Sequence, residues 1–335
     1  LRPPPHFVPQ MDRSQPLITP AEASALTHAV RAAEFFEGAT APNPPVGAVL
    51  LDPRGNLLAV AAHERAGNPH AERLAITKAQ DDGTLAQAHT LVVTLEPCNH
   101  HGKTRPCTEA VLELFQTGAL RRVVYGAPDP NPKAQGGAER LRQAGLEVVS
   151  AQSEACLRQL RPFTHWIQTG RPWVLIKQAF DKKGSVIPPR GQKTFTSNES
   201  LELAHRLRRS ADAILTGSGT ILADDPKFSV RRIADHPGKH RPLVILDRRQ
   251  RVPESYLKEA RERGFKPLRA QDVAQALTLL GQKGCLSVLV EAGPTLVQEL
   301  ERLELWDEKV VVQTSGSGPD LVTRTTRVDA MRPKG

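Results

Sequence analysis

The chain has 335 residues and a mass of 36.6 kDa, which is too long for one ordinary domain, and we expect two domains of about 150 residues each. With 39% hydrophobic and 24% charged residues, the composition excludes a disordered chain, and no apolar run approaches the roughly 20 residues that span a bilayer. The net charge of +9 suggests a nucleic-acid partner. However, residues 1–170 hold 16 basic and 16 acidic residues and residues 171–335 hold 29 and 20, which argues against a protein that coats polynucleotides uniformly.

Residues 1–20 are rich in proline and lack apolar periodicity, so we expect a loose N-terminal arm. The rest of the first half alternates short apolar runs with amphipathic segments. We predict helices over residues 21–36, 70–80, 108–116 and 137–144, and strands over 46–51, 57–62, 90–95, 122–126 and 146–150. This alternation predicts a sheet that is at least partly parallel and carries helices on its faces.

Residues 151–171 are predicted to form a connecting helix, after which the alternation begins again. Ser197 is a suitable N-cap for the first helix of the second half. We predict helices over residues 199–208, 274–282 and 294–303, and strands over 173–177, 213–216, 243–247, 286–290 and 309–312. Because we find no repeat between the halves, the sequence indicates two different α/β domains.

Three segments of the first half carry residues that suit zinc: Pro69-His-Ala-Glu72, Glu96-Pro-Cys98 and Pro106-Cys107. His and Cys are preferred zinc ligands, and three protein ligands leave a fourth position for water, as in catalytic sites. Zinc lowers the pKa of such a water toward 7, and a nearby carboxylate can shuttle its protons. His70, Glu72 and Cys98 match the His-x-Glu and Pro-Cys pattern of zinc deaminases.

Each of these residues also has an ordinary structural interpretation. A single Cys is usually a small core residue, and a single surface His usually has no chemical role. A His-x-Glu at the start of a helix, together with a Pro-Cys after a buried strand, favours a zinc site instead. Cys156 and Cys285 lack such neighbours, so we expect them to be structural. Four cysteines are too few for a disulfide scaffold, and we expect a soluble, cytoplasmic protein.

The spacing of the two cysteines separates this chain from many zinc deaminases. Eight residues lie between Cys98 and Cys107, in place of the two residues of a Cys-x-x-Cys motif. The intervening loop is polar and carries His100 and Lys103. Such donors beside a metal would suit a phosphorylated small molecule.

With these motifs, the chain resembles the bifunctional riboflavin-biosynthesis deaminase/reductase family over about residues 25–150. The motifs are Pro42-Asn-Pro44, Val46-Gly-Ala48, His63 with Gly67-Asn-Pro-His-Ala-Glu72, Thr94–Cys98, His100–Cys107 and Asp129-Pro-Asn-Pro132. The resemblance implies His70, Cys98 and Cys107 as zinc ligands and Glu72 as the catalytic proton shuttle. It also implies a substrate pocket lined by Asn43, His63, His100, Lys103, Asp129 and Asn131. Asn43 and the segment 129–131 can instead be simple turn formers.

The second half carries two glycine-containing turns after predicted strands, at residues 213–220 and 290–296, where backbone N–H groups could surround a phosphate. We find no G-x-G-x-x-G motif, which disfavours a Rossmann domain. This half resembles the reductase domain of the same family, which is similar to dihydrofolate reductase and uses NADPH. The resemblance implies substrate contacts for Arg208, Arg231 and Glu291, and NADPH contacts for Thr196, Thr220, Asp224 and Gly293. Arg208 and Arg231 would suit phosphate as bidentate donors, although solvated surface arginines are the plain alternative.

Three features depart from the family pattern. The family's Ser-Leu-Asp-Gly turn is replaced by Asp181-Lys-Lys-Gly184, and its Trp-Ile-Thr by Thr194-Phe-Thr196. The sequence also stops at Gly335, where the family continues into a final pair of strands, so we expect a C-terminally short reductase domain.

Together these patterns predict a cytidine-deaminase-like α/β/α domain followed by a dihydrofolate-reductase-like α/β domain. The expected organisation is a loose arm at 1–20, a zinc-dependent deaminase domain at 21–150, a connecting segment at 151–171 and an NADPH-dependent reductase domain at 172–335. We expect a phosphorylated pyrimidine substrate, no nucleic-acid or membrane partner, and a homo-oligomer. We also expect the anion-binding surface to centre on Arg208 and Arg231.

Two alternatives stay open. One is a nucleic-acid-editing zinc deaminase, which would use the net charge of +9 to bind the backbone. The other is a deaminase whose second domain has lost reductase activity and serves binding or oligomerisation.

Overall fold

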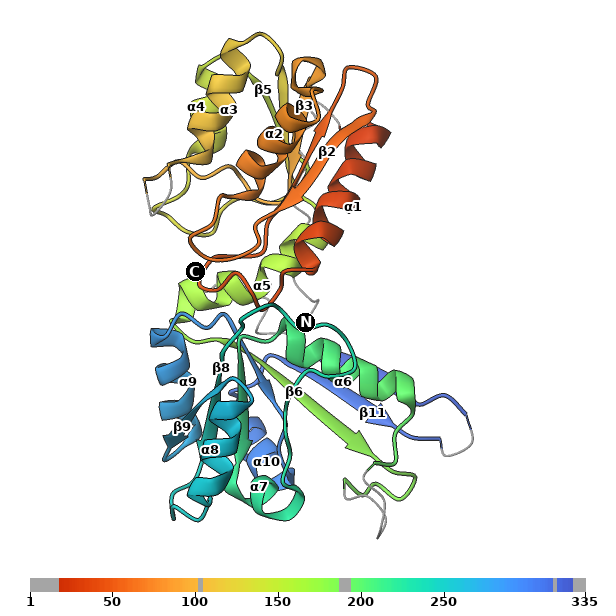
Figure 1. Cartoon of the computed structure of the whole chain (residues 1–335), viewed down its shortest axis with the longest axis vertical. Coiled ribbons are helices and arrows are strands. Elements are labelled where there is room, and N and C mark those ends of the chain that lie inside the picture. The colour runs from red at the N-terminus through yellow and green to blue at the C-terminus, as the bar shows by residue number, and fades with distance from the viewer. Residues whose placement is uncertain (1–17, 102–104, 187–193, 316–317, 328–335) are drawn as a thin grey trace, which may run out of the picture. The chain divides into compact units, whose positions relative to one another are not determined.

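The computed structural model describes residues 18–101, 105–186, 194–315 and 318–327, and the chain divides into two compact units. The first unit comprises residues 1–32, 46–62 and 69–157, and the second comprises 33–45, 63–68 and 158–335. Each unit is built around one β-sheet with helices packed against it (Figure 1). The domain boundaries expected near residues 150 and 172 stay predictions.

The sheet of the first unit mixes antiparallel and parallel pairing, as predicted. Strand β1 pairs antiparallel with β2 and β3, whereas β3, β4 and β5 are parallel to one another. β1, β3 and β4 are buried along their whole length, which explains their continuous apolar sequences. The strand order is β2 (Leu57–Ala62), β1 (Gly47–Leu51), β3 (Thr90–Val93), β4 (Arg122–Tyr125) and β5 (Glu147–Ser150).

Helices of the first unit bury their apolar faces on this sheet. Leu50 and Leu91 from the strands, Val111 and Leu141 from the helices, and the alanines of α2 form one core. The 3₁₀ turn η1 (Leu85–Gln87) precedes β3. The helices are α1 (Pro20–Glu34), α2 (Ala71–Asp81), α3 (Cys107–Gln116) and α4 (Gly137–Gln143), and α5 (Glu154–Thr169) follows β5.

The sheet of the second unit has seven strands, all parallel to their neighbours except the last, β12, which pairs antiparallel with β11. Apolar side chains of both faces form cores around Ile176, Leu215 and Leu280 and around Ile214, Leu243 and Leu289. The strand order is β12 (Leu321–Thr326), β11 (Glu308–Gln313), β6 (Trp173–Phe180), β10 (Ser287–Val290), β7 (Ala213–Gly217), β8 (Arg241–Leu246) and β9 (Phe265–Ala270).

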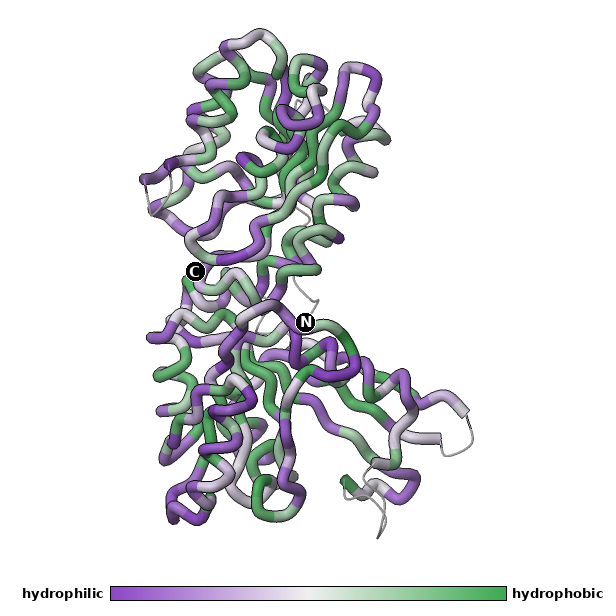
Figure 2. The backbone as a smooth tube through the Cα atoms, in the orientation of Figure 1, coloured by the Kyte–Doolittle hydropathy of each residue, from purple (hydrophilic) through white to green (hydrophobic). Residues whose placement is uncertain are grey.

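Among the described residues of this unit, five helices follow strand β6. Ser197 caps the first of them as predicted, because its side chain accepts a hydrogen bond from the backbone N–H of Ser200 at 3.2 Å. The helices are α6 (Asn198–Ser210), α7 (Ser218–Asp224), α8 (Glu254–Glu262), α9 (Val273–Gln282) and α10 (Pro294–Arg302). Figure 2 shows hydrophobic residues gathered along the strands of both sheets. Within the described residues, no helix is long and apolar enough to cross a membrane.

Several elements of the second unit were not predicted. The glycine-rich turn expected at the end of the segment 213–220 is instead the start of helix α7, while α8, β9 and β12 had no counterpart. β9 contains Lys266, Pro267 and Arg269 and pairs only with β8, as is common for an edge strand. β12 is exposed along most of its length and therefore shows no apolar alternation. After Glu291 the chain therefore forms two paired strands, β11 and β12, where the sequence predicted a single strand.

The close packing of α1 on β1 gives a first prediction. A Cβ added at Gly47 would lie 1.9 Å from the carbonyl oxygen of Ala29 in α1. Gly47→Ala must therefore push the helix from the strand, and we expect the free energy of unfolding to fall by about 1–3 kcal/mol. Urea unfolding followed by far-UV circular dichroism measures this loss.

Gly219→Ala is the matched control, because a Cβ at Gly219 would meet no described atom within 4 Å. This variant should unfold at a urea concentration no lower than that of the parent chain, because alanine is a better helix former than glycine and Gly219 lies in α7. Equal midpoints for Gly47→Ala and the parent would contradict the close contact between α1 and β1.

Candidate functional site

The three predicted metal ligands converge in the first unit. His70 is the N-cap of α2, Cys107 is the first residue of α3, and Cys98 lies in the loop after β3. Their ligand atoms all lie within 4.8 Å of one another. His70 Nδ1 lies 3.2 Å from Cys107 Sγ and 3.6 Å from Cys98 Sγ, and the backbone N–H of Cys107 donates to Cys98 Sγ at 3.4 Å.

These separations fit a shared zinc ion. With zinc about 2.1 Å from nitrogen and about 2.3 Å from sulfur, two ligands at a tetrahedral angle lie about 3.6 Å apart. The two distances from His70 to the cysteines, 3.2 and 3.6 Å, are close to that value. One imidazole and two thiolates also form a donor set that leaves a fourth position for water. The residues present therefore fit the metal.

Glu72 stands beside this cluster in the first turn of α2 and is only 3% exposed. Burial raises the pKa of its carboxyl group, and the nearby Cys98 raises it further. Its side chain is hydrogen-bonded to Cys107, which places the carboxyl group next to the metal ligands. A raised pKa makes a carboxylate a better proton acceptor, which suits a proton shuttle.

The two cysteines share a hydrogen bond in which Cys107 is the donor. This bond lowers the pKa of the Cys98 thiol to about 4, and it raises the pKa of Cys107. The lowered pKa of Cys98 favours its thiolate form. A thiolate is the form of cysteine that binds zinc.

Glu96, which the sequence analysis quoted only as part of a motif, connects the loops around the cluster. Its backbone N–H donates to the carbonyl of Ala127 at 2.9 Å. Its side chain accepts hydrogen bonds from the backbone N–H groups of Ala138 at 2.9 Å and Asp129 at 3.4 Å. The loop after β3, the loop after β4 and the first turn of α4 therefore meet at one buried carboxylate. Only the fold reveals this role, because the three partners are distant in sequence.

Asp129 and Asn131 form the turn that follows β4. The backbone N–H of Asn131 donates to Asp129 Oδ1 at 2.8 Å, so the turn-forming alternative holds for this pair. Burial raises the pKa of Asp129 to about 6, while this backbone hydrogen bond and His100 act in the opposite direction. His100 Nδ1 is buried and has no partner among the described atoms. The substrate contacts expected for Asp129, Asn131 and His100 stay predictions, and Lys103 lies outside the described residues.

Asn43 and His63 lie in the two short segments, 33–45 and 63–68, that are grouped with the second unit. Asn43 Nδ2 lies 3.1 Å from His63 Nε2, and His63 is buried. The structure thus brings these two residues together, and their role in a deaminase pocket stays a prediction.

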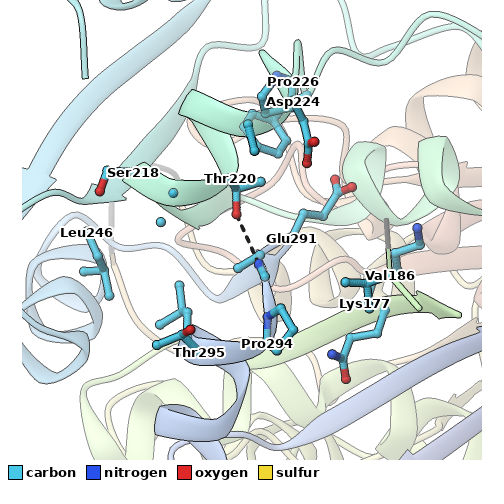
Figure 3. Close-up of a pocket in the computed structure, with 18 of the residues that line it drawn as sticks. Lys177, Val186, Ser218, Thr220, Asp224, Pro226, Leu246, Glu291, Pro294 and Thr295 are labelled. Atoms are coloured by element: carbon cyan, nitrogen blue, oxygen red, sulfur yellow. Dashed lines mark hydrogen bonds between the residues drawn. The ribbon is translucent and has the colours of Figure 1, made fainter. Parts of the chain in front are cut away.

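The second unit contains a pocket of about 1730 Å³, shown in Figure 3. Its walls come from β6, α7, the turn after β8 and the segment 291–296. The backbone N–H of Gly293 donates to Thr220 Oγ1 at 3.1 Å, which connects α7 to the segment after β10 (Figure 3). All seven residues implied for the reductase line this one pocket: Thr196, Arg208, Thr220, Asp224, Arg231, Glu291 and Gly293.

A buried ion pair between Arg208 and Glu291 lies in the wall of this pocket. Arg208 donates to both carboxylate oxygens of Glu291, at 2.5 and 2.8 Å. Burial alone would raise the pKa of Glu291, but Arg208 outweighs burial and the pKa is lowered. The two N–H donors of Arg208 that were expected to bind a phosphate therefore bind Glu291 instead. Arg208 instead positions this carboxylate in the pocket wall.

Lys177, on β6, is a pocket residue that sequence analysis missed. It lines the same pocket as Glu291 (Figure 3), and burial lowers the pKa of its ammonium group although Glu291 opposes the shift. A lysine directly after the apolar run Trp173–Ile176 was the available signal. Its charge can contact substrate or cofactor.

Arg231 lines the pocket on a segment held by a buried histidine. The backbone N–H of Arg231 donates to His205 Nδ1 at 3.0 Å, and burial together with nearby arginines lowers the pKa of His205 to about 4. His205 is therefore a neutral acceptor that fixes the backbone. The guanidinium of Arg231 is left to face the pocket with a contact to Ser229 Oγ at 3.4 Å.

The altered turn Asp181–Gly184 keeps a well-formed geometry. Asp181 Oδ1 accepts hydrogen bonds from the backbone N–H groups of Lys183 and Ser185, both at 2.8 Å, and Gly184 has a φ of +78°. An Asp therefore closes this turn by its own side chain. The second altered segment lines the pocket through Thr194, Phe195 and Thr196.

Family models match both halves of the chain. Residues 19–127 match the cytidine and deoxycytidylate deaminase zinc-binding region, and residues 172–316 match the RibD C-terminal domain. The first match includes the His70, Cys98 and Cys107 cluster, and the second includes every residue implied for the reductase.

Relatives and solved structures agree with these models. Riboflavin biosynthesis protein RibD of Mycobacterium tuberculosis is 39% identical over 264 residues, which cover 78% of this chain and 75% of the relative. RibD of Corynebacterium ammoniagenes is 32% identical over 300 residues, which cover 88% and 86%.

Among solved structures, a diaminohydroxyphosphoribosylaminopyrimidine deaminase/5-amino-6-(5-phosphoribosylamino)uracil reductase from Thermotoga maritima is 30% identical. It superposes with a TM-score of 0.76 over 90% of this chain and 89% of that chain. Acinetobacter baumannii RibD is 29% identical with a TM-score of 0.75, over 92% and 89%. Since the matches extend through both units, the chain belongs to the RibD family of riboflavin biosynthesis proteins, with a zinc-binding deaminase region and a RibD C-terminal domain.

Proposed function

We propose that the chain catalyses two successive steps of riboflavin biosynthesis. The first is hydrolytic deamination of 2,5-diamino-6-(5-phosphoribosylamino)pyrimidin-4(3H)-one, and the second is NADPH-dependent reduction of the ribose to ribityl. The observation that carries the first step is the convergence of His70, Cys98 and Cys107 beside the buried carboxyl group of Glu72. The solved relative from Thermotoga maritima bears the names of both activities.

In the deaminase step, His70, Cys98 and Cys107 hold zinc, which supplies a water nucleophile at neutral pH when bound. Glu72 accepts a proton from the attacking water and passes it to the ring nitrogen and then to the leaving amino group. Burial supports this role, because it raises the pKa of Glu72 toward the pH at which both protonation states are populated.

The remaining residues of this site recognise the substrate. Asp129, Asn131 and Asn43 hydrogen-bond the pyrimidine and ribose, and His63, His100 and Lys103 bind polar groups and the phosphate. The buried and unpartnered Nδ1 of His100 supports its part of this assignment. Glu96 positions the loops and does not itself contact substrate.

In the reductase step, bound NADPH would supply a hydride to ribose C1′, the bond between C1′ and the ring oxygen would break, and that oxygen would take up a proton. Glu291 and Arg231 contact the substrate, and Arg208 positions Glu291 for this contact. Thr196, Thr220, Asp224 and Gly293 hold the cofactor. Their common pocket supports these roles, and its volume of about 1730 Å³ accommodates two ligands together.

We assign the deaminase to a domain spanning residues 21–150 and the reductase to a domain spanning 172–335, after a connecting segment. A homo-oligomer in the cytoplasm is the proposed form of the enzyme. One experiment separates the proposed function from its two alternatives, a nucleic-acid editor and a deaminase with an inactive second domain. The diaminopyrimidine is supplied with and without NADPH, and the products are identified. A nucleic-acid editor would leave this substrate unchanged, and an inactive second domain would yield the deaminated product alone.

Glu72→Gln tests the proton shuttle. The amide keeps the size of the side chain but cannot accept the proton, so ammonia release should fall about 10²–10⁴-fold. Zinc content, measured by atomic emission, should stay at the level of the parent chain. Ammonia release at the parent rate would rule out Glu72 as the shuttle.

Cys98→Ser and Cys107→Ser test the metal site. Each removes one of three ligands, so we expect zinc content and ammonia release to be lost together. Cys156→Ser is the matched control, because Cys156 is buried away from the ligand cluster and should keep its zinc. Full zinc content in either ligand variant would contradict the assignment.

Glu291→Gln tests the reductase pocket. Loss of the carboxylate leaves Arg208 without its partner, and NADPH oxidation on the deaminated pyrimidine should fall at least about tenfold. Ammonia release from the diaminopyrimidine should not change. Glu304→Gln is the control, because Glu304 is exposed and lies outside the pocket. Equal NADPH oxidation in the two variants would remove Glu291 from the mechanism.

A further inference from the structure

The strand pair β11–β12, of which the sequence predicted only one strand, is hydrogen-bonded at two places next to the altered segments of the second unit. Gln313, the last residue of β11, donates through Nε2 to the carbonyl of Asp181 at 2.6 Å, where the altered turn begins. Asp320 directly precedes β12, and its Oδ2 accepts a hydrogen bond from the backbone N–H of Ser197 at 2.8 Å. Ser197 directly follows the altered segment 194–196. Both altered segments are therefore connected to one strand pair.

The carboxylate of Asp320 accepts several hydrogen bonds at the start of α6. Besides the backbone N–H of Ser197, the hydroxyl groups of Ser197, Ser200 and Thr314 bond to it. Burial alone would raise the pKa of Asp320, but these hydrogen bonds, of which that of Ser200 has the largest effect, outweigh burial and lower the pKa. The ionised carboxylate is thus the favoured form. It joins the strand pair to the first turn of α6.

The segment that precedes Ser197 is part of the pocket wall. Thr194, Phe195 and Thr196 all line the reductase pocket. None of the three is buried. Within the described residues, Thr194 and Thr196 hydrogen-bond to each other, through their hydroxyl groups at 3.0 Å and from the backbone N–H of Thr196 to Thr194 Oγ1 at 3.2 Å. These bonds shape the segment locally, but they do not attach it to the rest of the unit.

The hydrogen bond between Ser197 and Asp320 supplies such an attachment. The N–H of Ser197 belongs to the peptide group that Ser197 shares with Thr196. Because a peptide group is planar, fixing this N–H also fixes the direction of the Thr196 carbonyl. Asp320 itself is absent from the residues that line the pocket in the described part of the chain. It can therefore act on a ligand only through the segment that it holds.

We infer that Asp320 is a positioning residue for the reductase reaction and holds Thr196 in the pocket wall by way of Ser197. The inference rests on the proposed reductase function, in which Thr196 contacts the cofactor. A segment without this attachment would lose conformational freedom when the ligand binds, and that loss weakens binding. Asp320 restricts the segment before the ligand arrives. It should therefore act on the affinity for NADPH and leave the rate of the chemical step unchanged.

Asp320→Ala removes the acceptor of the Ser197 N–H. With the deaminated pyrimidine as substrate, we expect the KM for NADPH to rise at least about fivefold, because a hydrogen bond to a charged group is lost. The kcat of NADPH oxidation and the release of ammonia from the diaminopyrimidine should stay at the level of the parent chain. An unchanged KM for NADPH would overturn the inference.

Asp320→Asn separates the hydrogen bond from the charge. The amide oxygen of Asn can still accept the Ser197 N–H, so the KM for NADPH should stay within about twofold of the parent value. A KM as high as that of Asp320→Ala would attribute the effect to the lost charge and overturn the inference.

Asp52→Ala is the matched control. Asp52 lies in the first unit and accepts hydrogen bonds from the backbone N–H groups of Arg54 and Asn56, both at 2.8 Å. This variant loses the same charge and comparable hydrogen bonds away from the reductase pocket, so its KM for NADPH should equal that of the parent chain. An equal rise in Asp52→Ala and Asp320→Ala would contradict a specific role of Asp320.

Hydrogen exchange tests the attachment without ligand or catalysis. Mass spectrometry of peptides that span residues 194–200 should show faster amide exchange in Asp320→Ala than in the parent chain, and parent-like exchange in Asp52→Ala. Unchanged exchange in Asp320→Ala would overturn the inference even if NADPH is oxidised. Faster exchange in Asp320→Ala, combined with a parent chain that oxidises no NADPH, would support the attachment of Ser197 and refute the proposed reductase activity.

Discussion

Parallel pairing of strands is the constraint on which both sites depend. In the first unit, β3 and β4 are parallel neighbours, so the loops that follow them, with Cys98 and Asp129, leave the same edge of the sheet. In the second unit, β7, β8 and β10 are parallel, and α7, the turn at residues 248–251 (the arginine turn) and Glu291 follow their carboxyl ends. Residues distant in sequence therefore meet because the ladder hydrogen bonds fix the strand register.

Buried carboxylates then hold these loops in place. Glu96 joins two loops and a helix by accepting backbone hydrogen bonds, and Asp247 does the same within the arginine turn. Glu291 is held instead by a guanidinium, which keeps it ionised despite burial. Removing a partner from such a group leaves a buried charge unsatisfied, which is costly. The loops are thus rigid in their backbone, while the side chains that face ligands stay available.

The structure shows which part of the second unit carries the positive charge of the pocket. The sequence placed all of the excess positive charge in residues 171–335, and we expected it to centre on Arg208 and Arg231. Glu291 neutralises Arg208, so the positive charge of the pocket shifts toward Arg231 and the arginine turn. The basic character of this half fits small phosphorylated ligands at two places in one pocket, and it requires no polynucleotide.

The sequence by itself determined the zinc chemistry and the general architecture. His-x-Glu, Pro-Cys and the second Pro-Cys are local patterns whose donor atoms already specify the metal, and strand–helix alternation is visible because burial leaves a periodic apolar record. Only the tertiary structure decided which charges are neutralised and which carboxylates organise the loops. Glu96 and Glu291 find partners 33 to 83 residues away, and exposed strands such as β12 leave no apolar pattern to read. Such pairings depend on distances in space, which sequence spacing does not contain.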